Sequence, residues 1–174
     1  DTAANAAGCY SLRFFLDGEW KSVLVDDRLP TTEDPRRPEL AAANLAYTRC
    51  VDSGGGSGAM MLWASLIEKA YAKVHGCYKA ISGGEISEAL LDLTGAPTLS
   101  VSFDEADFDS ELLWHSMREW VSEGLPMGCA TSSENPELKE VGLVGQHAYS
   151  ILNVREVQLR QQQPSCHRVF RWQD

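Results

Sequence analysis

The order of hydrophobic periodicities along the chain constrains its fold more than any other feature of the sequence. Residues 9–27 alternate between apolar and polar side chains, as strands do. Residues 61–123 repeat apolar side chains every three or four positions, as helices do, and residues 125–172 alternate again. A parallel sheet needs strands and helices in turn. Strands, then helices, then strands therefore predict the α+β class.

A β-hairpin is expected at residues 8–30. The runs CYSLRFFL and EWKSVLVDD flank the pair Asp17-Gly18, which is typical of a tight two-residue turn. Pro30 ends the second strand, because proline cannot donate a hydrogen bond to a ladder. Residues 31–58 are polar and rich in Pro, Ala and Gly, and they are expected to form a long surface loop.

Three helices are expected in the middle of the chain, at residues 61–76, 82–95 and 108–124. Each ends at a glycine that suits a left-handed cap, namely Gly76, Gly95 and Gly124. Asp109 or Ser110 is expected to cap the start of the third helix. The apolar positions expected to face inward are Leu62, Trp63, Leu66, Ile67, Ala70, Tyr71, Val74, Ile86, Ala89, Leu90, Leu93, Leu112, Leu113, Met117, Trp120 and Val121.

The alternation of apolar and polar residues in the last part of the chain predicts three strands, at residues 125–133, 147–157 and 166–172. His147 opens the second of them. Such a histidine is either a polar cap at a sheet edge or the general base for a cysteine or serine nucleophile. A base needs an orienting partner on its second ring nitrogen. Asn153 lies too far along a straight strand, at about 3.3 Å per residue, so a partner is expected near residues 168–174 of the neighbouring strand.

Charge and cysteine usage exclude several function classes. The net charge of −10 disfavours nucleic acid as a partner, and no apolar run is long enough to predict a membrane span. The first ten residues do not resemble a signal peptide. The five cysteines are scattered and form no C-x-x-C pair. They are expected to be small buried thiols of a cytoplasmic protein, without disulfides or a structural metal.

Three blocks of the sequence resemble the calpain family of papain-like cysteine proteases. The stretch LIEKAYAKVHGCYKAISGGEISEALLDLTG is similar to the family pattern L-L-E-K-A-Y-A-K, G-x-Y-x-A-x-x-G-G and E-x-x-x-D-x-T-G. The stretch DGEWKSVLVDDRLPT resembles G-E-W-x-x-V-x-x-D-D-x-L-P, and HAYSILNVREV resembles the segment that holds the catalytic histidine. The blocks occur in family order over nearly the whole chain.

The resemblance implies a role for several residues. His147 matches the catalytic base, and Gly83 and Gly84 match the pair at the junction of the two protease lobes, where the second glycine helps to hold substrate backbone. Gln146 stands where the family usually has a substrate-binding glycine. Residues 1–82 then correspond to the later part of the cysteine-bearing lobe, and residues 83–174 to the first part of the histidine-bearing lobe. The implied fold is an incomplete papain-like calpain protease core with an N-terminal β-hairpin, central helices and a C-terminal antiparallel sheet.

The sequence also departs from the family. The G-x-C-W motif of the nucleophile is absent from the 174 residues, so the chain alone is expected to be inactive. Asp174 falls near the slot of the orienting asparagine, so either an aspartate replaces that asparagine or the chain stops before it. A carboxylate in that slot would favour the imidazolium form of His147. Met61 replaces an acidic calcium ligand of the family, and a thioether is a poor ligand for Ca²⁺. No cofactor or metal site is therefore predicted in this chain, and calcium is left open for the full-length protein.

Three functions are consistent with these features. The first is part of a calpain-like cysteine endopeptidase that acts on protein or peptide substrates. The second is a catalytically dead calpain-like module that binds a protein partner or serves as a scaffold, which Gln146 and Met61 favour. The third is a hydrolase that uses one of its own cysteines, which is disfavoured because no thiol has an activating context. An upstream G-x-C-W in the gene product would favour the first over the second.

Overall fold

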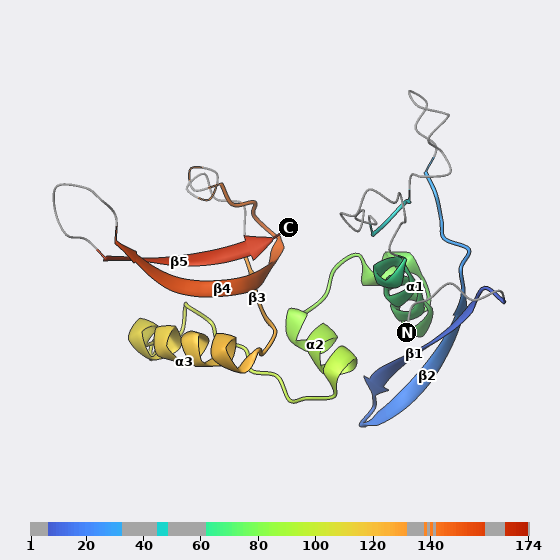
Figure 1. Cartoon of the computed structure of the whole chain (residues 1–174), viewed down its shortest axis with the longest axis horizontal. Helices are drawn as coiled ribbons and strands as arrows, with labels where there is room; N and C mark the ends of the chain where they lie inside the picture. Colours follow the sequence, from blue (N-terminus) through green and yellow to red (C-terminus); the bar gives the residue numbers. More distant parts are fainter. Residues whose placement is uncertain are drawn as a thin grey trace. The chain divides into compact units, whose positions relative to one another are not determined.

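The structure is a computed structural model of the 174-residue chain, and it describes residues 7–32, 45–48, 62–131, 138, 140, 142–158 and 166–173. The chain forms two compact units, Asp1–Pro97 and Thr98–Asp174. Figure 1 shows helices and small antiparallel sheets in both. The predicted α+β class is confirmed. None of the described helices is long and apolar enough to cross a membrane.

The first unit is built on the predicted hairpin, which is confirmed. Strands β1 (Cys9–Leu16) and β2 (Glu19–Asp26) pair antiparallel from Leu16 opposite Glu19 to Cys9 opposite Asp26. The turn residues Asp17 and Gly18 have φ angles of 55° and 82°. Both values are positive, as a turn that matches the twist of the two strands requires.

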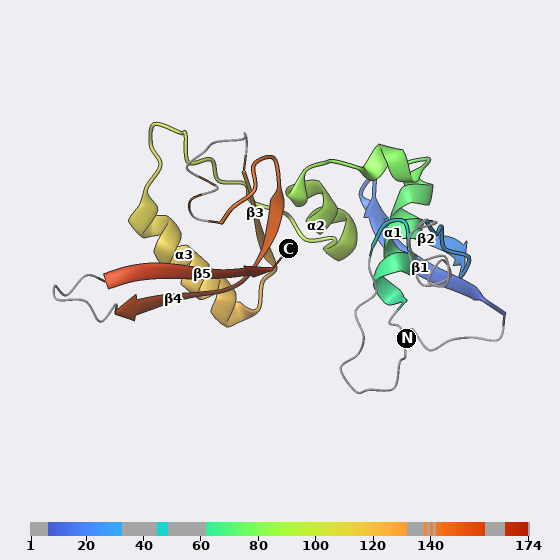
Figure 2. The same ribbon diagram turned by 90° about the horizontal axis from the view of Figure 1, so that it is seen from above.

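Two helices and a short 3-10 helix follow the hairpin in this unit. They are α1 (Trp63–Val74), the 3-10 helix η2 (Tyr78–Ile81) and α2 (Ile86–Thr94). Figure 2 shows α1 against the hairpin, and the contact between them is a core of Phe14, Val25, Leu66 and Ala70. The predicted caps are confirmed, since Gly76 and Gly95 adopt φ angles of 99° and 69°.

The inward positions of these two helices were predicted only in part. Leu66 and Ala70 are buried as expected, but the side chains of Trp63 and Leu93 are exposed. Trp63 is the first residue of α1 and Leu93 the penultimate residue of α2. Both residues keep the helical period of the buried positions, but the period alone does not indicate which apolar side chains a neighbouring element covers.

The buried polar residue of α2 attaches that helix to α1. The Tyr71 hydroxyl donates a hydrogen bond of 2.9 Å to Oδ2 of Asp92, which is buried. Burial of the Tyr71 phenol and this carboxylate raise the pKa of Tyr71 well above its usual range. At the end of α2, a Cβ on Gly95 would lie 2.9 Å from the Trp20 ring. The D-x-T-G and G-E-W blocks are therefore in contact within this unit.

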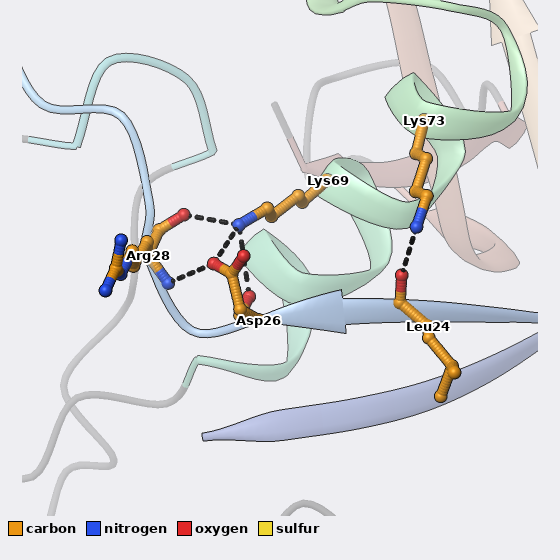
Figure 3. A network of polar contacts seen from close by, with 5 residues as sticks. All are labelled: Leu24, Asp26, Arg28, Lys69 and Lys73. Atoms are coloured by element: carbon orange, nitrogen blue, oxygen red, sulfur yellow. Dashed lines mark hydrogen bonds and ion pairs between the residues drawn. The ribbon is translucent and has the colours of Figure 1, made fainter. Parts of the chain in front are cut away.

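A lysine on α1 forms hydrogen bonds with the end of β2 and the residues that follow it. Lys69 Nζ donates to Oδ1 and the backbone oxygen of Asp26, at 2.6 and 3.1 Å, and to the backbone oxygen of Arg28 at 2.5 Å. One turn further on, Lys73 Nζ donates to the backbone oxygen of Leu24 at 2.8 Å (Figure 3). These contacts join the polar edge of α1 to the outer end of the hairpin.

The second unit packs a helix on a three-stranded antiparallel sheet. Helix α3 (Ser110–Glu123) is followed by strands β3 (Met127–Ala130), β4 (Ala148–Gln158) and β5 (Cys166–Gln173), in the sheet order β3-β4-β5. These three strands confirm the prediction. Asp109 caps the helix by accepting from the backbone N–H groups of Glu111 and Leu112, and Gly124 ends it with a φ of 72°.

The inward face of α3 differs from the prediction at two residues. Trp114, Met117 and Val154 form the buried core of this unit, and Leu113, Trp120, Val121, Met127 and Ile151 pack against it. Leu112 was predicted to face inward, but it is 65% exposed, whereas Trp114 is 3% exposed. Leu112 and Trp114 lie about 200° apart around the helix, at 100° per residue, so the helix cannot bury both against one sheet.

A β-bulge in β4 sets the face that meets α3. The register of β4 against β5 shifts between Ile151 and Asn153, which leaves Leu152 as the extra residue. Simple alternation would place Ile151 and Val154 on opposite faces. With the bulge, both contribute to the core beneath α3, while Leu152 is half exposed.

Two predictions on chain organisation stay open. Thr31 and Leu45 form an isolated antiparallel bridge, and most of the loop predicted at residues 31–58 lies outside the described residues. The boundary between the two compact units in the sequence falls between Pro97 and Thr98. The predicted lobe boundary after residue 82 refers to the protease family rather than to these units, and it stays a prediction.

Candidate active site

His147 stands one residue before β4 and is exposed. Its backbone continues the pairing of β4 with β3 by one residue, since the Thr131 N–H donates to the His147 oxygen at 3.0 Å. Pairs on one face of an antiparallel sheet recur every second residue. His147 therefore shares a face with Tyr149, and Thr131 with Cys129.

A threonine side chain holds the backbone on the N-terminal side of the histidine. Thr131 Oγ1 accepts a hydrogen bond from the His147 N–H at 3.1 Å and donates one to the Val144 oxygen at 2.6 Å. The hydroxyl has a single proton, and the shorter contact takes it. Thr131 thus bridges the two ends of the turn from Val144 to His147.

A buried tyrosine also forms a hydrogen bond with this turn. The Val144 N–H donates to the Tyr149 hydroxyl oxygen at 2.8 Å, and Tyr149 is 4% exposed. Its ring lies 4.7 Å from the His147 ring, at an interplanar angle of 80°. An edge-to-face contact of this kind is a favourable geometry for two aromatic rings. Tyr149 therefore supports both the turn and the imidazole.

Gln146 lies inside this turn in a conformation that side chains rarely adopt. Its φ is 53°, so it and Asp17 are the positive-φ residues other than glycine within the described part of the chain. The left-handed region costs an L-residue about 1–2 kcal/mol. Gln146 is exposed, next to His147.

The two glycines before α2 have no structural need to be glycine in the described residues. Gly83 and Gly84 are exposed, and a Cβ built on either would meet no atom within 4 Å. Neither adopts a positive φ. Glycines at bulges, caps and left-handed turns have a backbone reason to be glycine, and this pair lacks one.

The cysteines differ from their predicted burial. Cys9, Cys77 and Cys129 are exposed rather than buried, and the other two lie in positions whose side chains are not described. Cys129 is directly opposite Tyr149 in the β3–β4 register. Although the residue is exposed as a whole, desolvation of its thiol raises the pKa of Cys129, which lowers its thiolate fraction near neutral pH. The Cys129 thiol is therefore not an activated nucleophile.

Comparison with known proteins decides the family. The profile described as "Calpain family cysteine protease" matches residues 1–171. The chain belongs to the calpain family. A calpain-type cysteine protease of Oryza sativa subsp. japonica is 37% identical to it over 158 residues, which are 88% of this chain and 7% of the relative.

Two calpains from animals are also similar to the chain. The calpain of Schistosoma mansoni is 36% identical over 154 residues, or 88% of this chain and 18% of the relative. Human calpain-14 is 34% identical over 151 residues, or 87% of this chain and 19% of the relative. This calpain-family chain therefore spans 7 to 19% of the length of these three curated relatives.

Not every residue expected in the calpain site is described. Strand β5 ends with Gln173 opposite Ser150, three residues after His147, whereas Asp174 and Met61 lie outside the described residues. Gly83 and Gly84 belong to one compact unit, and Gln146 and His147 to the other. Among the described residues, no group of three or more His, Cys, Asp or Glu side chains could hold a metal ion.

Sequence reasoning missed Thr131 and Tyr149. Tyr149 was within the motif HAYSILNVREV, but alternation alone did not indicate that its hydroxyl would meet Val144. Thr131 was placed in the strand at residues 125–133 without a role. The register of β3 against β4 is the missing signal, because it places Thr131 opposite His147.

Proposed function

We propose that this chain forms part of a calpain-type cysteine endopeptidase catalytic domain and carries its general base, His147. The observation that carries the proposal is an exposed imidazole at the start of a strand whose backbone is fixed on both sides. In this reaction His147 takes the proton of a cysteine thiol, and the thiolate attacks the scissile carbonyl carbon. The imidazolium then gives the proton to the leaving amine, and water hydrolyses the thioester.

We assign substrate binding to Gly83 and Gly84 in the first compact unit and, separately, to Gln146 in the second. The glycine pair supports this assignment because neither packing nor a positive φ in the described residues accounts for it. A bare backbone at that point can approach an extended peptide closely. Gln146 supports it by lying beside His147 on an exposed turn.

We assign the orienting role to Asp174. The antiparallel pairing of β4 with β5 brings the end of β5 toward the start of β4, which is the direction from which a partner for His147 is needed. A carboxylate would hold the ring through a charged hydrogen bond and favour its imidazolium form. An asparagine amide would orient the ring without that charge effect.

The nucleophile in this proposal comes from a polypeptide segment other than these 174 residues. The G-x-C-W motif does not occur among them, and the raised pKa of the Cys129 thiol makes it a poor substitute. Protein or peptide chains are the substrates that the chemistry requires. Calcium regulation and a cytoplasmic location are part of the same proposal, and no calcium ligand is assigned in this chain.

A specific observation favours a second candidate, a calpain-like module that has lost catalysis and binds a protein partner or serves as a scaffold. Gln146 replaces a glycine that the family resemblance places next to the base, and it bears a side chain in a left-handed conformation. A side chain at that point can obstruct substrate backbone. The two candidates differ in whether the gene product cleaves peptide bonds.

A protease assay with a fluorogenic peptide and added calcium separates the candidates. The 174-residue chain is expected to show no turnover. The complete gene product is expected to be active, and His147→Ala is expected to lower kcat by about 1000-fold or more. His115→Ala, which changes an exposed histidine on α3, is the matched control and should retain activity.

Two results would contradict the proposal. Turnover by the 174-residue chain that is lost in His147→Ala would mean that one of its own cysteines is the nucleophile. An inactive gene product that nevertheless contains a G-x-C-W segment would favour the binding or scaffold module.

A further inference from the structure

We propose that Thr131 is a positioning residue for His147, acting through a hydrogen-bonded clip that also includes Tyr149. The inference rests on the proposed role of His147 as general base. It adds a residue from the neighbouring strand to that site, and it explains how an exposed turn can hold an imidazole in a defined direction. Thr131 touches no reacting atom, so its effect on the base is indirect.

The clip is made of hydrogen bonds that converge on the turn from Val144 to His147. Thr131 Oγ1 receives the His147 N–H and donates to the Val144 oxygen. The Thr131 N–H donates to the His147 oxygen, and Tyr149 Oη receives the Val144 N–H. Both backbone polar groups of Val144 and both of His147 are therefore bonded.

The hydrogen bonds of the clip hold the backbone before and after the strained residue, Gln146. Gln146, with its φ of 53°, lies between the two residues whose backbones are held. Strained conformations persist where the surrounding contacts over-determine them. The clip is such a set of contacts, because relaxation of Gln146 would move Val144 or His147 and lengthen at least one of its hydrogen bonds.

The position of the imidazole follows from the same contacts. A fixed backbone at His147 fixes the direction of its Cα–Cβ bond, and the ring then lies 4.7 Å from the ring of Tyr149. Tyr149 is itself immobilised by burial at 4% exposure. Loss of the Thr131 hydroxyl would release the N–H of His147 and the oxygen of Val144 together, and the ring contact would no longer be enforced.

Thr131→Val is the variant that tests this step, because valine keeps the branched shape and replaces the hydroxyl with a methyl group that cannot hydrogen-bond. Nuclear magnetic resonance of the 174-residue chain should show two changes. The His147 amide should exchange about fivefold faster or more, as expected for the loss of one hydrogen bond. The nuclear Overhauser effect between the rings of His147 and Tyr149 should be lost.

Two further variants make the result specific. Thr131→Ser restores the hydroxyl and should recover both signals. Ser122→Ala is the matched control, since it removes a hydroxyl that donates to the Glu119 oxygen on α3 in the same unit, and it should leave both signals unchanged. Loss of the ring contact in Thr131→Ser would overturn the proposal, as would its survival in Thr131→Val.

These measurements do not depend on catalysis. If the clip is present and the gene product is inactive, the proposed function fails and the positioning inference stands. If the gene product is active and Thr131→Val leaves the two signals unchanged, the base assignment stands and the inference fails.

Discussion

At the scale of single residues, Gln146 is the position where local preference and tertiary structure conflict. It adopts the left-handed region, where a Cβ is disfavoured and glycine is the usual residue. By contrast, Asp17 has a positive φ in a hairpin turn that demands it. The hydrogen bonds of Val144 with Thr131 and Tyr149, rather than the turn sequence, keep Gln146 in this strained conformation.

Gln146→Gly should therefore stabilise the second unit by about 0.5–1 kcal/mol, since the release of left-handed strain exceeds the added entropy of the unfolded chain. Chemical denaturation followed by the signals of that unit would measure the change. Gln146→Ala is the control, because it keeps the Cβ and removes the rest of the side chain, and it should give no stabilisation. Equal stabilisation by Ala and Gly would show that the side chain beyond Cβ, and not the backbone conformation, is unfavourable.

At the scale of elements, α1 is joined to the hairpin by both an apolar core and a polar network. Phe14 and Val25 of the hairpin meet Leu66 and Ala70 of α1 in the core. Lys69 lies outside that core and bonds to the end of β2. The Lys69 hydrogen bond, together with the N–H of Arg28, lowers the pKa of Asp26 below its ordinary value of 3.8. The network therefore favours the ionised form of Asp26.

Because the pKa of Asp26 is lowered in the folded state, the stability that this network contributes depends on pH. A carboxyl whose pKa is lower in the folded state contributes stability above its unfolded pKa, and this contribution is lost as the pH falls through the folded value. Asp26→Asn should therefore lower the melting temperature slightly near neutral pH, and the difference from the wild type should close as the pH drops below 3.8. The effect should be small, because Asp26 is exposed.

Thermal melting over a pH series would measure this effect. In a Lys69→Met background, Asp26→Asn should have a smaller effect, as a double-mutant cycle would show. A difference between wild type and Asp26→Asn that persists at low pH would mean that the asparagine acts by another route than charge.

At the scale of the whole molecule, each compact unit has its own apolar core. The first is centred on Phe14 and Leu66, and the second on Trp114 and Met117. Separate cores can open separately, since local unfolding follows cooperative units. The chain is therefore expected to respond to a core substitution in one unit at a time.

Leu66→Ala should destabilise the first unit by about 2–5 kcal/mol, because Leu66 is 3% exposed and its removal leaves a cavity. Amide hydrogen exchange should accelerate in β1 and β2 and stay unchanged in β3 and β4. Met117→Ala is the reciprocal variant and should affect only the second unit. A similar acceleration in both units after either substitution would mean that the chain unfolds as one cooperative body.

The sequence by itself determined the elements and the family, because these depend on local signals. The Asp17-Gly18 turn, the Asp109 cap and the glycines that end the helices all act over a few residues, and all were predicted correctly. His147 was singled out from its place at a strand start and from the family motif. The role given to it, and to Gly83, Gly84, Gln146 and Asp174, stays a prediction.

Only the tertiary structure decided which side chains meet. The bulge at Leu152 brings Val154 to the face of Ile151, and a period of two cannot indicate where such an extra residue falls. Trp114 instead of Leu112 faces the sheet, because the rotation of a helix is set by the surface on which it packs. Thr131 meets His147 across 16 positions of sequence, and the physical reason is the register of two strands, which local preference does not encode.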